Sequence, residues 1–109
     1  MRVSFDGNIY RVSRVTGPSH NFLAIAVSHS MPERIGVKAH RINEEPAVVE
    51  ESKILQAVTG SFRQRSEETG ISIWPCRVEY VASDTADYET YKRLSEAVFN
   101  QAAEGDLEV

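Results

Sequence analysis

Residues 22–27 read FLAIAV, an uninterrupted apolar stretch bounded by polar residues at 20–21 and 28–30. Such a short run is typical of a strand that is buried on both faces, because a helix of ordinary length needs more residues. The stretch therefore predicts a strand near the centre of a sheet, and both faces of that strand need a cover.

Further strands are expected on either side of this stretch. The pair Asp6-Gly7 is a strong two-residue turn signal between alternating segments, so we expect a hairpin with these residues as its loop. After a loop at 31–36, the chain is expected to return antiparallel beside residues 20–29. Four successive strands are predicted, at about residues 2–5, 9–16, 20–29 and 37–42.

Two amphipathic helices are predicted in the second half of the chain. Apolar residues recur at three- and four-residue steps after Pro46, which predicts a helix that runs to Thr69 and stops at Gly70. A second helix with an apolar stripe follows possible N-caps at 83–85 and ends at 103–105.

A fifth strand is expected between the helices, at residues 71–82, with Trp74 and Cys76 on its apolar face. Pro75 has no amide hydrogen, so an edge position or a β-bulge is expected near Trp74. Residues 1–109 are thus predicted to form a single α+β domain. Its architecture is a two-layer sandwich: a mostly antiparallel five-stranded sheet carries both helices on one face, in the order β-β-β-β-α-β-α.

Composition narrows the class of partner. Twelve Lys and Arg against sixteen Asp and Glu give a net charge of -4, which disfavours nucleic acid as a partner. No apolar run is long enough for a signal peptide or a membrane span, so we expect a cytoplasmic protein that does not bind membranes. The glycines build no phosphate-binding loop, and no cofactor is expected.

The histidines are the first candidates for chemistry. With residues 20–29 and 37–42 paired antiparallel, His29 and His40 would be diagonal neighbours on one face of the sheet, and Lys38 would lie opposite His29. These three residues form the candidate pocket. No carboxylate or cysteine accompanies them, so no metal site is assigned, and histidines that simply form hydrogen bonds at strand ends are the alternative.

No catalytic residue is assigned. Ser28 and Ser30 flank His29, but adjacent strand residues point to opposite faces, and no Gly-x-Ser-x-Gly motif is present. Cys76, the single cysteine, is interpreted as a small buried residue of the core. Whether the protein is an enzyme stays open.

Acidic pairs at 44–45, 50–51 and 67–68 surround the first helix. Such runs usually form a solvated helix face, and they also offer a surface that could meet a protein partner with a basic surface.

A homodimer is predicted from the central strand. Two helices cover only one face of the sheet, so either the even-numbered or the odd-numbered residues of 22–27 are left for a second copy. The candidate dimer face comprises Leu23, Ile25, Val27 and Ile42. A strongly curled sheet, or loop 31–36 folded back over the sheet, is the alternative cover.

Two classes of function follow. The first is a small interaction or regulatory module without catalytic activity that acts as a homodimer. The second is a small-molecule-binding domain or a small enzyme with a pocket around His29 and His40.

Overall fold

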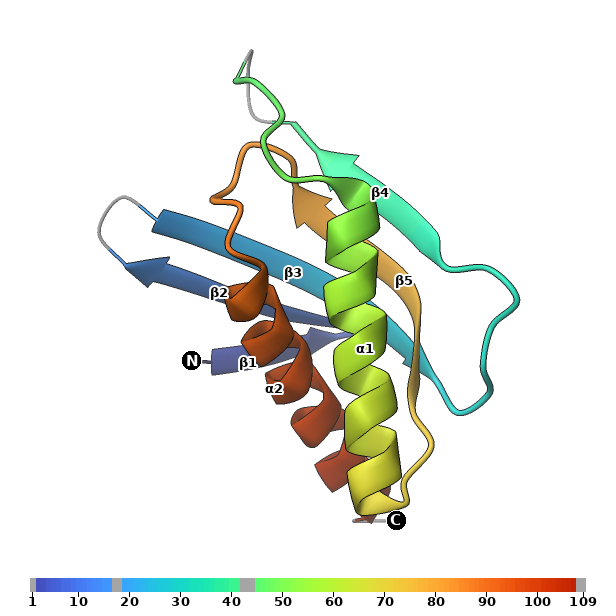
Figure 1. Cartoon of the computed structure of the whole chain (residues 1–109). Coiled ribbons are helices and arrows are strands. Elements are labelled where there is room, and N and C mark those ends of the chain that lie inside the picture. The colour runs from blue at the N-terminus through green and yellow to red at the C-terminus, as the bar shows by residue number, and fades with distance from the viewer. Residues whose placement is uncertain (1, 17–18, 42–44, 108–109) are drawn as a thin grey trace.

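The computed structural model describes residues 2–16, 19–41 and 45–107. The elements follow the predicted order (Figure 1). No helix in this described part of the chain is long and apolar enough to cross a membrane. The strands are β1 (Arg2–Asp6), β2 (Ile9–Thr16), β3 (Ser19–Ser28), β4 (Gly36–His40) and β5 (Trp74–Val81), and the helices are α1 (Glu51–Thr69) and α2 (Tyr88–Leu107).

β1 and β2 form the predicted hairpin, but its loop lies one residue later than expected. Asp6 pairs with Ile9, so Gly7 and Asn8 make the turn. Gly7 has a φ of 69°, in the left-handed region that glycine adopts without a Cβ penalty. With this loop, each residue of β1 pairs with the residue of β2 that lies two positions beyond the expected partner. Because side chains alternate between the faces with a period of two, each one keeps the face that the alternation predicted.

The position of β4 departs from the prediction. The sheet order is β1-β2-β3-β5-β4, so β5 lies between β3 and β4. β4 pairs with β5 in parallel, and α1 supplies the long crossover that a parallel pair requires. The predicted antiparallel pairing of residues 20–29 with 37–42 is therefore wrong.

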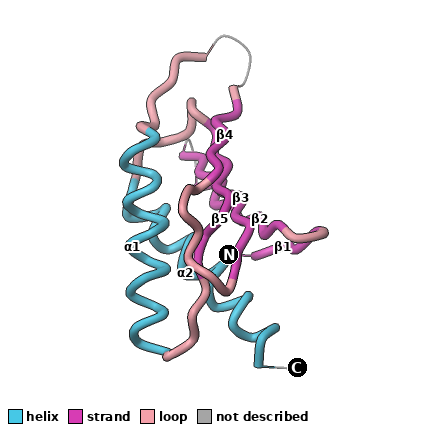
Figure 2. Tube along the Cα trace, turned by 90° about the vertical axis from the view of Figure 1, so that its right-hand side faces the viewer, coloured by secondary structure: helices cyan, strands magenta, loops and turns pink. Residues whose placement is uncertain are grey.

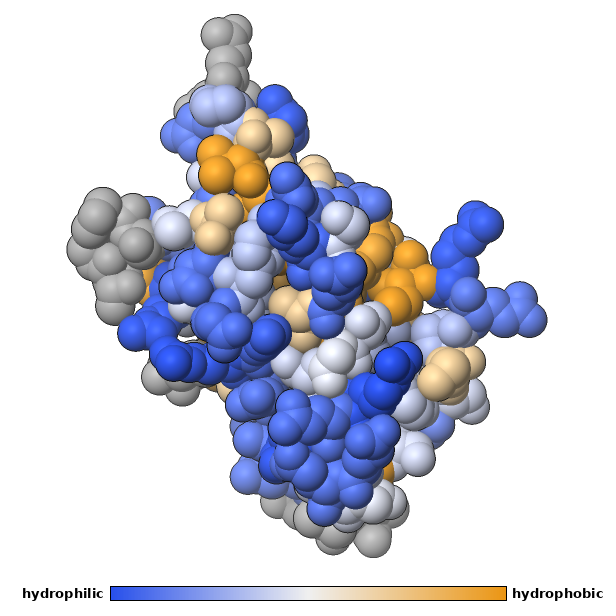
Figure 3. Space-filling model, in the orientation of Figure 1, coloured by the Kyte–Doolittle hydropathy of each residue, from blue (hydrophilic) through white to orange (hydrophobic). Residues whose placement is uncertain are grey.

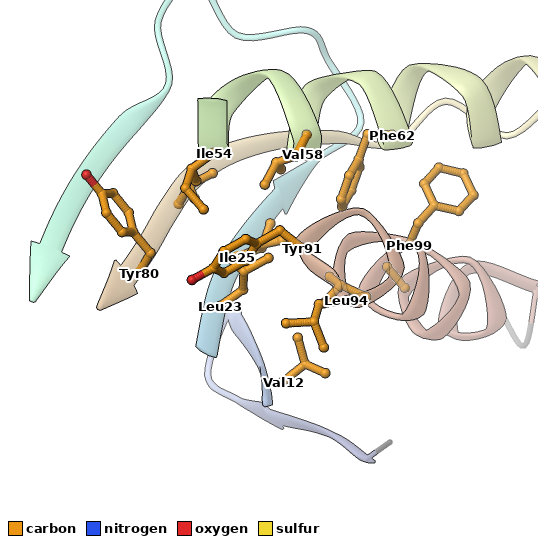
Figure 4. Packing of buried hydrophobic residues seen from close by; sticks show 14 of the residues in the cluster. Val12, Leu23, Ile25, Ile54, Val58, Phe62, Tyr80, Tyr91, Leu94 and Phe99 are labelled. Atoms are coloured by element: carbon orange, nitrogen blue, oxygen red, sulfur yellow. The ribbon is translucent and has the colours of Figure 1, made fainter. Parts of the chain in front are cut away.

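Both helices pack on one face of the sheet, as predicted, and form the second layer (Figure 2). α1 begins at Glu51, later than the predicted start near Pro46. Phe62 of α1 and Phe99 of α2 meet edge to face, with ring centroids 5.6 Å apart. The largest fully buried side chains of this core are Val12, Leu23, Ile25, Ile54, Val58, Phe62, Ile73, Val78, Tyr91, Leu94, Val98 and Phe99 (Figure 4).

The helices cover the odd-numbered face of β3. Leu23 and Ile25 are fully buried beneath them, and Val27 packs against the same core. The candidate dimer face is corrected accordingly, because the chain's own helices occupy it. Ile42, its fourth member, lies outside the described residues.

The opposite face of the sheet, called the open face below, carries the even-numbered residues of β3. Ala24 is 2% and Ala26 is 8% exposed, although both helices lie on the other side. Arg11 is the neighbour of Ala24 in β2, and Arg77 is the neighbour of Ala26 in β5, so long side chains stand beside each small one. The apolar cluster on this face comprises Ile9, Phe22, Ala24, Ala26 and Cys76.

The connection from β5 to α2 is fastened to the first half of β3. The Phe22 amide donates to the Asp84 carboxylate at 2.9 Å, and the Thr85 amide donates to the His20 carbonyl at 3.0 Å. The side chain of Asn21 donates to the Thr85 carbonyl at 2.8 Å. Burial raises the pKa of Asp84, and its hydrogen bond with the backbone acts in the opposite direction.

Candidate functional site

A groove lies beside α1, between this helix and the loop that leads into β4. Its volume of about 420 Å³ lies within the range of sites that hold small ligands or single large side chains. Apolar side chains gather beside α1 at this place, over β4 and β5 (Figure 3). This α1 groove is lined by Met31, Pro32, Glu33, Arg34, Ile35, Leu55, Thr59, Arg63, Trp74 and Pro75.

One wall of the α1 groove is a stripe of α1. Leu55, Thr59 and Arg63 are spaced four residues apart, which places them on one face of the helix. The Thr59 hydroxyl donates to the Leu55 carbonyl at 2.6 Å. The hydroxyl group is therefore satisfied within the helix. The part of the wall that Leu55 and Thr59 form offers mainly apolar surface to the groove.

The start of β5 supplies Trp74 and Pro75 to the groove. β3 and β5 change register between Ala26 and Val27, which leaves Cys76 as the extra residue of a β-bulge. The bulge expected near Trp74 is confirmed, and it changes where the side chains go. Trp74 lines the groove, and Cys76 packs half-buried on the open face instead of in the core under the helices.

Two arginines give the α1 groove its charge. Arg34 lies on the loop and Arg63 on α1, and both are exposed. Within the part of the chain that the structure describes, no carboxylate lies within ion-pair distance of either guanidinium. Glu33 is the acidic residue of the lining, so two cations stand against one anion.

A second groove runs between α1 and α2. It is larger, at about 610 Å³, and polar or charged residue types predominate in its lining. Its two lysines already have acidic partners: Lys53 lies 3.4 Å from Glu50 and Lys92 lies 3.1 Å from Glu89. The surface of the second groove is therefore apolar in a smaller proportion than that of the α1 groove, and both of its cations are already paired.

A hydrogen-bonded network lies on the open face, across β4 and β5. The Glu79 carboxylate accepts from Arg77 Nε at 2.9 Å and bonds to His40 Nε2 at 2.7 Å. These bonds, with that of Arg77 first, hold the pKa of Glu79 below its ordinary value. Lys38 stands opposite Glu79 in the register and is exposed.

The three residues of the candidate pocket are not brought together in the predicted way. Lys38 and His40 share the open face of β4, whereas His29 follows β3 and lines a small cavity of about 80 Å³ with Tyr10 and Ala102. β5 lies between the two strands, so His29 and His40 are not diagonal neighbours. The described residues contain no group of three or more His, Cys, Asp or Glu that could hold a metal ion.

The acidic residues around α1 are partly engaged by neighbours on the same helix. Lys53 pairs with Glu50, and Arg65 pairs with Glu68 at 2.8 Å. Glu51 and Glu67 are exposed, and Glu44 lies outside the described residues.

Sequence reasoning missed the α1 groove. The four-residue spacing of Leu55, Thr59 and Arg63 beside the buried stripe could have indicated a helix face with a neighbour of its own. The alternation of β5 assigned Trp74 to the core, because the exact place of the bulge could not be read from Pro75.

No protein-family model, no curated protein and no solved structure matches this chain. A functional reading therefore rests on the geometry of the site.

Proposed function

We propose that this domain is a non-catalytic protein-interaction module. Its receptor site is the α1 groove, which takes up one large apolar side chain from a partner protein whose neighbouring residues are acidic. The observation that carries the proposal is the combination of an apolar groove of about 420 Å³ with two arginines that have no acidic partner among the described residues.

The lining suits an anchoring side chain. Trp74, Leu55 and Ile35 are half-buried and offer apolar area, and Met31 is 63% exposed on the loop. Interfaces are often anchored by one large side chain that fills such a pocket, and aromatic, Met and Arg residues are enriched around it.

The charge at the groove specifies the neighbours of that side chain. Arg34 and Arg63 stand at two walls that are distant in sequence, and together they leave an excess of positive charge beside an apolar floor. Carboxylates that flank the anchor would pair with them, and opposite charges at a rim raise the association rate and discriminate between partners.

The alternative of a small enzyme has less support. The hydrogen-bonded carboxylate and imidazole of Glu79 and His40 lie on the open face of the sheet and do not line the α1 groove. A catalytic acid or base needs a concave site that brings it against a substrate.

A short peptide tests the groove alone. We expect the capped tripeptide of glutamate, phenylalanine and glutamate to bind with roughly millimolar affinity. It should change the fluorescence of Trp74, the only tryptophan of the chain, because the phenylalanine would contact that ring.

Two variants of α1 form a matched pair for this test. Thr59→Phe fills the groove from the helix and should abolish the fluorescence change. Gln56→Phe places the same ring on the second groove, and binding should be retained. No change with the wild-type protein, or equal binding by both variants, would show that the proposal is wrong.

A further inference from the structure

We infer that the partner segment continues beyond the α1 groove as a sixth strand, added to the free edge of β4, and that this segment is extended and acidic. The inference rests on the proposed function, because it names the class of partner that the groove would anchor. It adds groups that the groove does not use, namely the backbone of β4 and the side chains of Lys38 and Arg41, to Arg34, which the groove and the edge share.

The backbone of β4 has two sides, and within residues 2–16, 19–41 and 45–107 only one of them forms hydrogen bonds to another strand. The Ala82 amide donates to the His40 carbonyl at 2.9 Å, so His40 directs its backbone groups toward β5. Backbone groups alternate along a strand, and Val37 and Ala39 therefore direct theirs to the outer edge. β4 is the last strand in the sheet order, and no hydrogen bond to this edge is found from any described residue.

The edge is accessible to an approaching chain. Gly36 and Ala39 are exposed, and neither carries a side chain that would hold another backbone at a distance. Unpaired edges of this kind bind extended peptides by main-chain hydrogen bonds, while pockets for alternate side chains supply specificity.

The cations around β4 specify an acidic segment. Residues 34–41 contain Arg34, Lys38 and Arg41 and no acidic residue, in a chain whose net charge is -4. No described carboxylate lies within ion-pair distance of these three side chains. Glu79, which stands opposite Lys38 in the register, is bonded to Arg77 and His40. By contrast, near the other edge strand, β1, Arg11 lies 3.7 Å from Asp6.

The α1 groove and the β4 edge belong to one continuous surface. The loop that lines the groove at 31–35 runs directly into β4 at Gly36, and Val37 lies on the side of the sheet that faces the helices. An added strand would thus point alternate side chains toward the groove side and toward Lys38 on the open face. The segment is therefore expected to alternate apolar and acidic residues.

A second copy of the chain fits this edge less well. Antiparallel pairing of two β4 strands about Lys38 would set the two Lys38 side chains opposite each other. Like charges in that position are destabilising. The same cations that favour an acidic strand therefore disfavour self-pairing.

The protein side of the test uses Ala39. Ala39→Pro removes an amide hydrogen that points away from β5, and proline is tolerated at such edge positions. With a capped peptide of about nine residues in which glutamate alternates with apolar residues, one of them phenylalanine, we expect Ala39→Pro to weaken binding about tenfold. The control Ala39→Thr keeps the amide and should bind like the wild type, and circular dichroism should show the same fold in both variants.

The peptide side of the test does not depend on any variant. Two forms of the peptide are made, methylated on the amide nitrogens of either its odd-numbered or its even-numbered residues. An added strand presents one set to β4 and the other to solvent, so one form should lose binding and the other should keep it. Lys38→Glu should weaken the unmethylated peptide about tenfold at low salt and less at high salt.

The outcomes separate the two proposals. If both methylated forms and Ala39→Pro bind like their controls while Thr59→Phe abolishes binding, the groove stands and the added strand is wrong. If neither the tripeptide nor the longer peptide binds, the proposed function itself fails.

Two further results would name another occupant of the β4 edge. A wild-type dimer that Ala39→Pro dissociates would assign the edge to a second copy, and displacement of the peptide by a thymidine oligonucleotide would assign the cations to phosphates. Either result would overturn the acidic strand.

Discussion

Glu79 is a residue whose ionisation depends on contacts made only in the folded chain. It accepts hydrogen bonds from groups on two strands, and its side chain is only 16% exposed. Arg77 and His40 both stabilise the carboxylate form, which lowers the pKa of Glu79 from its ordinary value of 4.5. The unfolded chain therefore binds this proton more readily than the folded one.

A pH-dependent contribution to stability follows. Because the folded pKa is depressed, the contribution of Glu79 is fully present above the unfolded pKa and is lost as the pH falls through the folded pKa. Glu79→Gln should lower the free energy of unfolding by about 1 kcal/mol near neutral pH, and the difference should vanish in acid. Urea denaturation at a series of pH values measures this. A difference that stays constant from neutral to acidic pH would contradict the assignment.

At the same scale, the sequence showed which residue types were present but not which of them would meet. Glu79 and His40 are 39 positions apart and bond because β4 lies next to β5. The alternation predicted Trp74 on the core face of β5. The extra residue of the bulge, Cys76, breaks that alternation, and the side chain of Trp74 lines the groove. Side-chain partners of this kind depend on strand neighbours, which a local pattern does not specify.

At the scale of elements, α1 contains a glycine that no contact with another described residue requires. A Cβ added at Gly60 would meet no atom of the described residues within 4 Å, and the backbone there is helical. Glycine in a helix interior lowers stability relative to alanine, because it loses more conformational freedom on folding.

Gly60→Ala should therefore raise the free energy of unfolding by about 0.5–1 kcal/mol, which urea denaturation measures. Gly70→Ala is the matched control at the end of the same helix. Gly70 has a φ of 73° and caps α1 by donating its amide to the Ser66 carbonyl, so alanine should destabilise the protein there. A loss of stability in Gly60→Ala would indicate a close approach that the chain's own contacts do not show.

The elements themselves were largely predictable. Apolar periodicity located both helices and all five strands, since each element must bury one face. The neighbour of β4 was not predictable in this way, because the pattern of residues 37–42 tells which face is apolar and not which strand lies alongside. The α1 groove could not be derived either, since one of its walls is the loop at 31–35, whose path has no periodic signal.

At the scale of the whole molecule, the open face is the surface of the sheet through which the predicted homodimer would have to form. The expected exposure of three apolar side chains of β3 is reduced, because Ala24 and Ala26 are small and almost fully buried. Phe22 and Cys76 are half-buried beside Ile9, and they are the apolar groups that a second copy could cover.

Light scattering at micromolar concentration tests this prediction. A dimer through the open face has about twice the chain mass of 12.2 kDa, and Phe22→Glu should return it to the monomer mass, because it would bury two carboxylates in the interface. Val48→Glu, at an exposed apolar residue outside the sheet, should leave the mass unchanged. A wild-type mass near 12.2 kDa would show that the homodimer prediction is wrong.

The place of β5 between β3 and β4 has a consequence for the chain as it leaves the ribosome. β1, β2 and β3 can form a sheet as soon as they are made, because their pairings are local. The flank of β3 that β5 will occupy then stays bare until α1 and β5 have been synthesised. During that interval the nascent protein presents the edge of its most apolar strand, which is the kind of surface that recruits other unfolded chains or a chaperone.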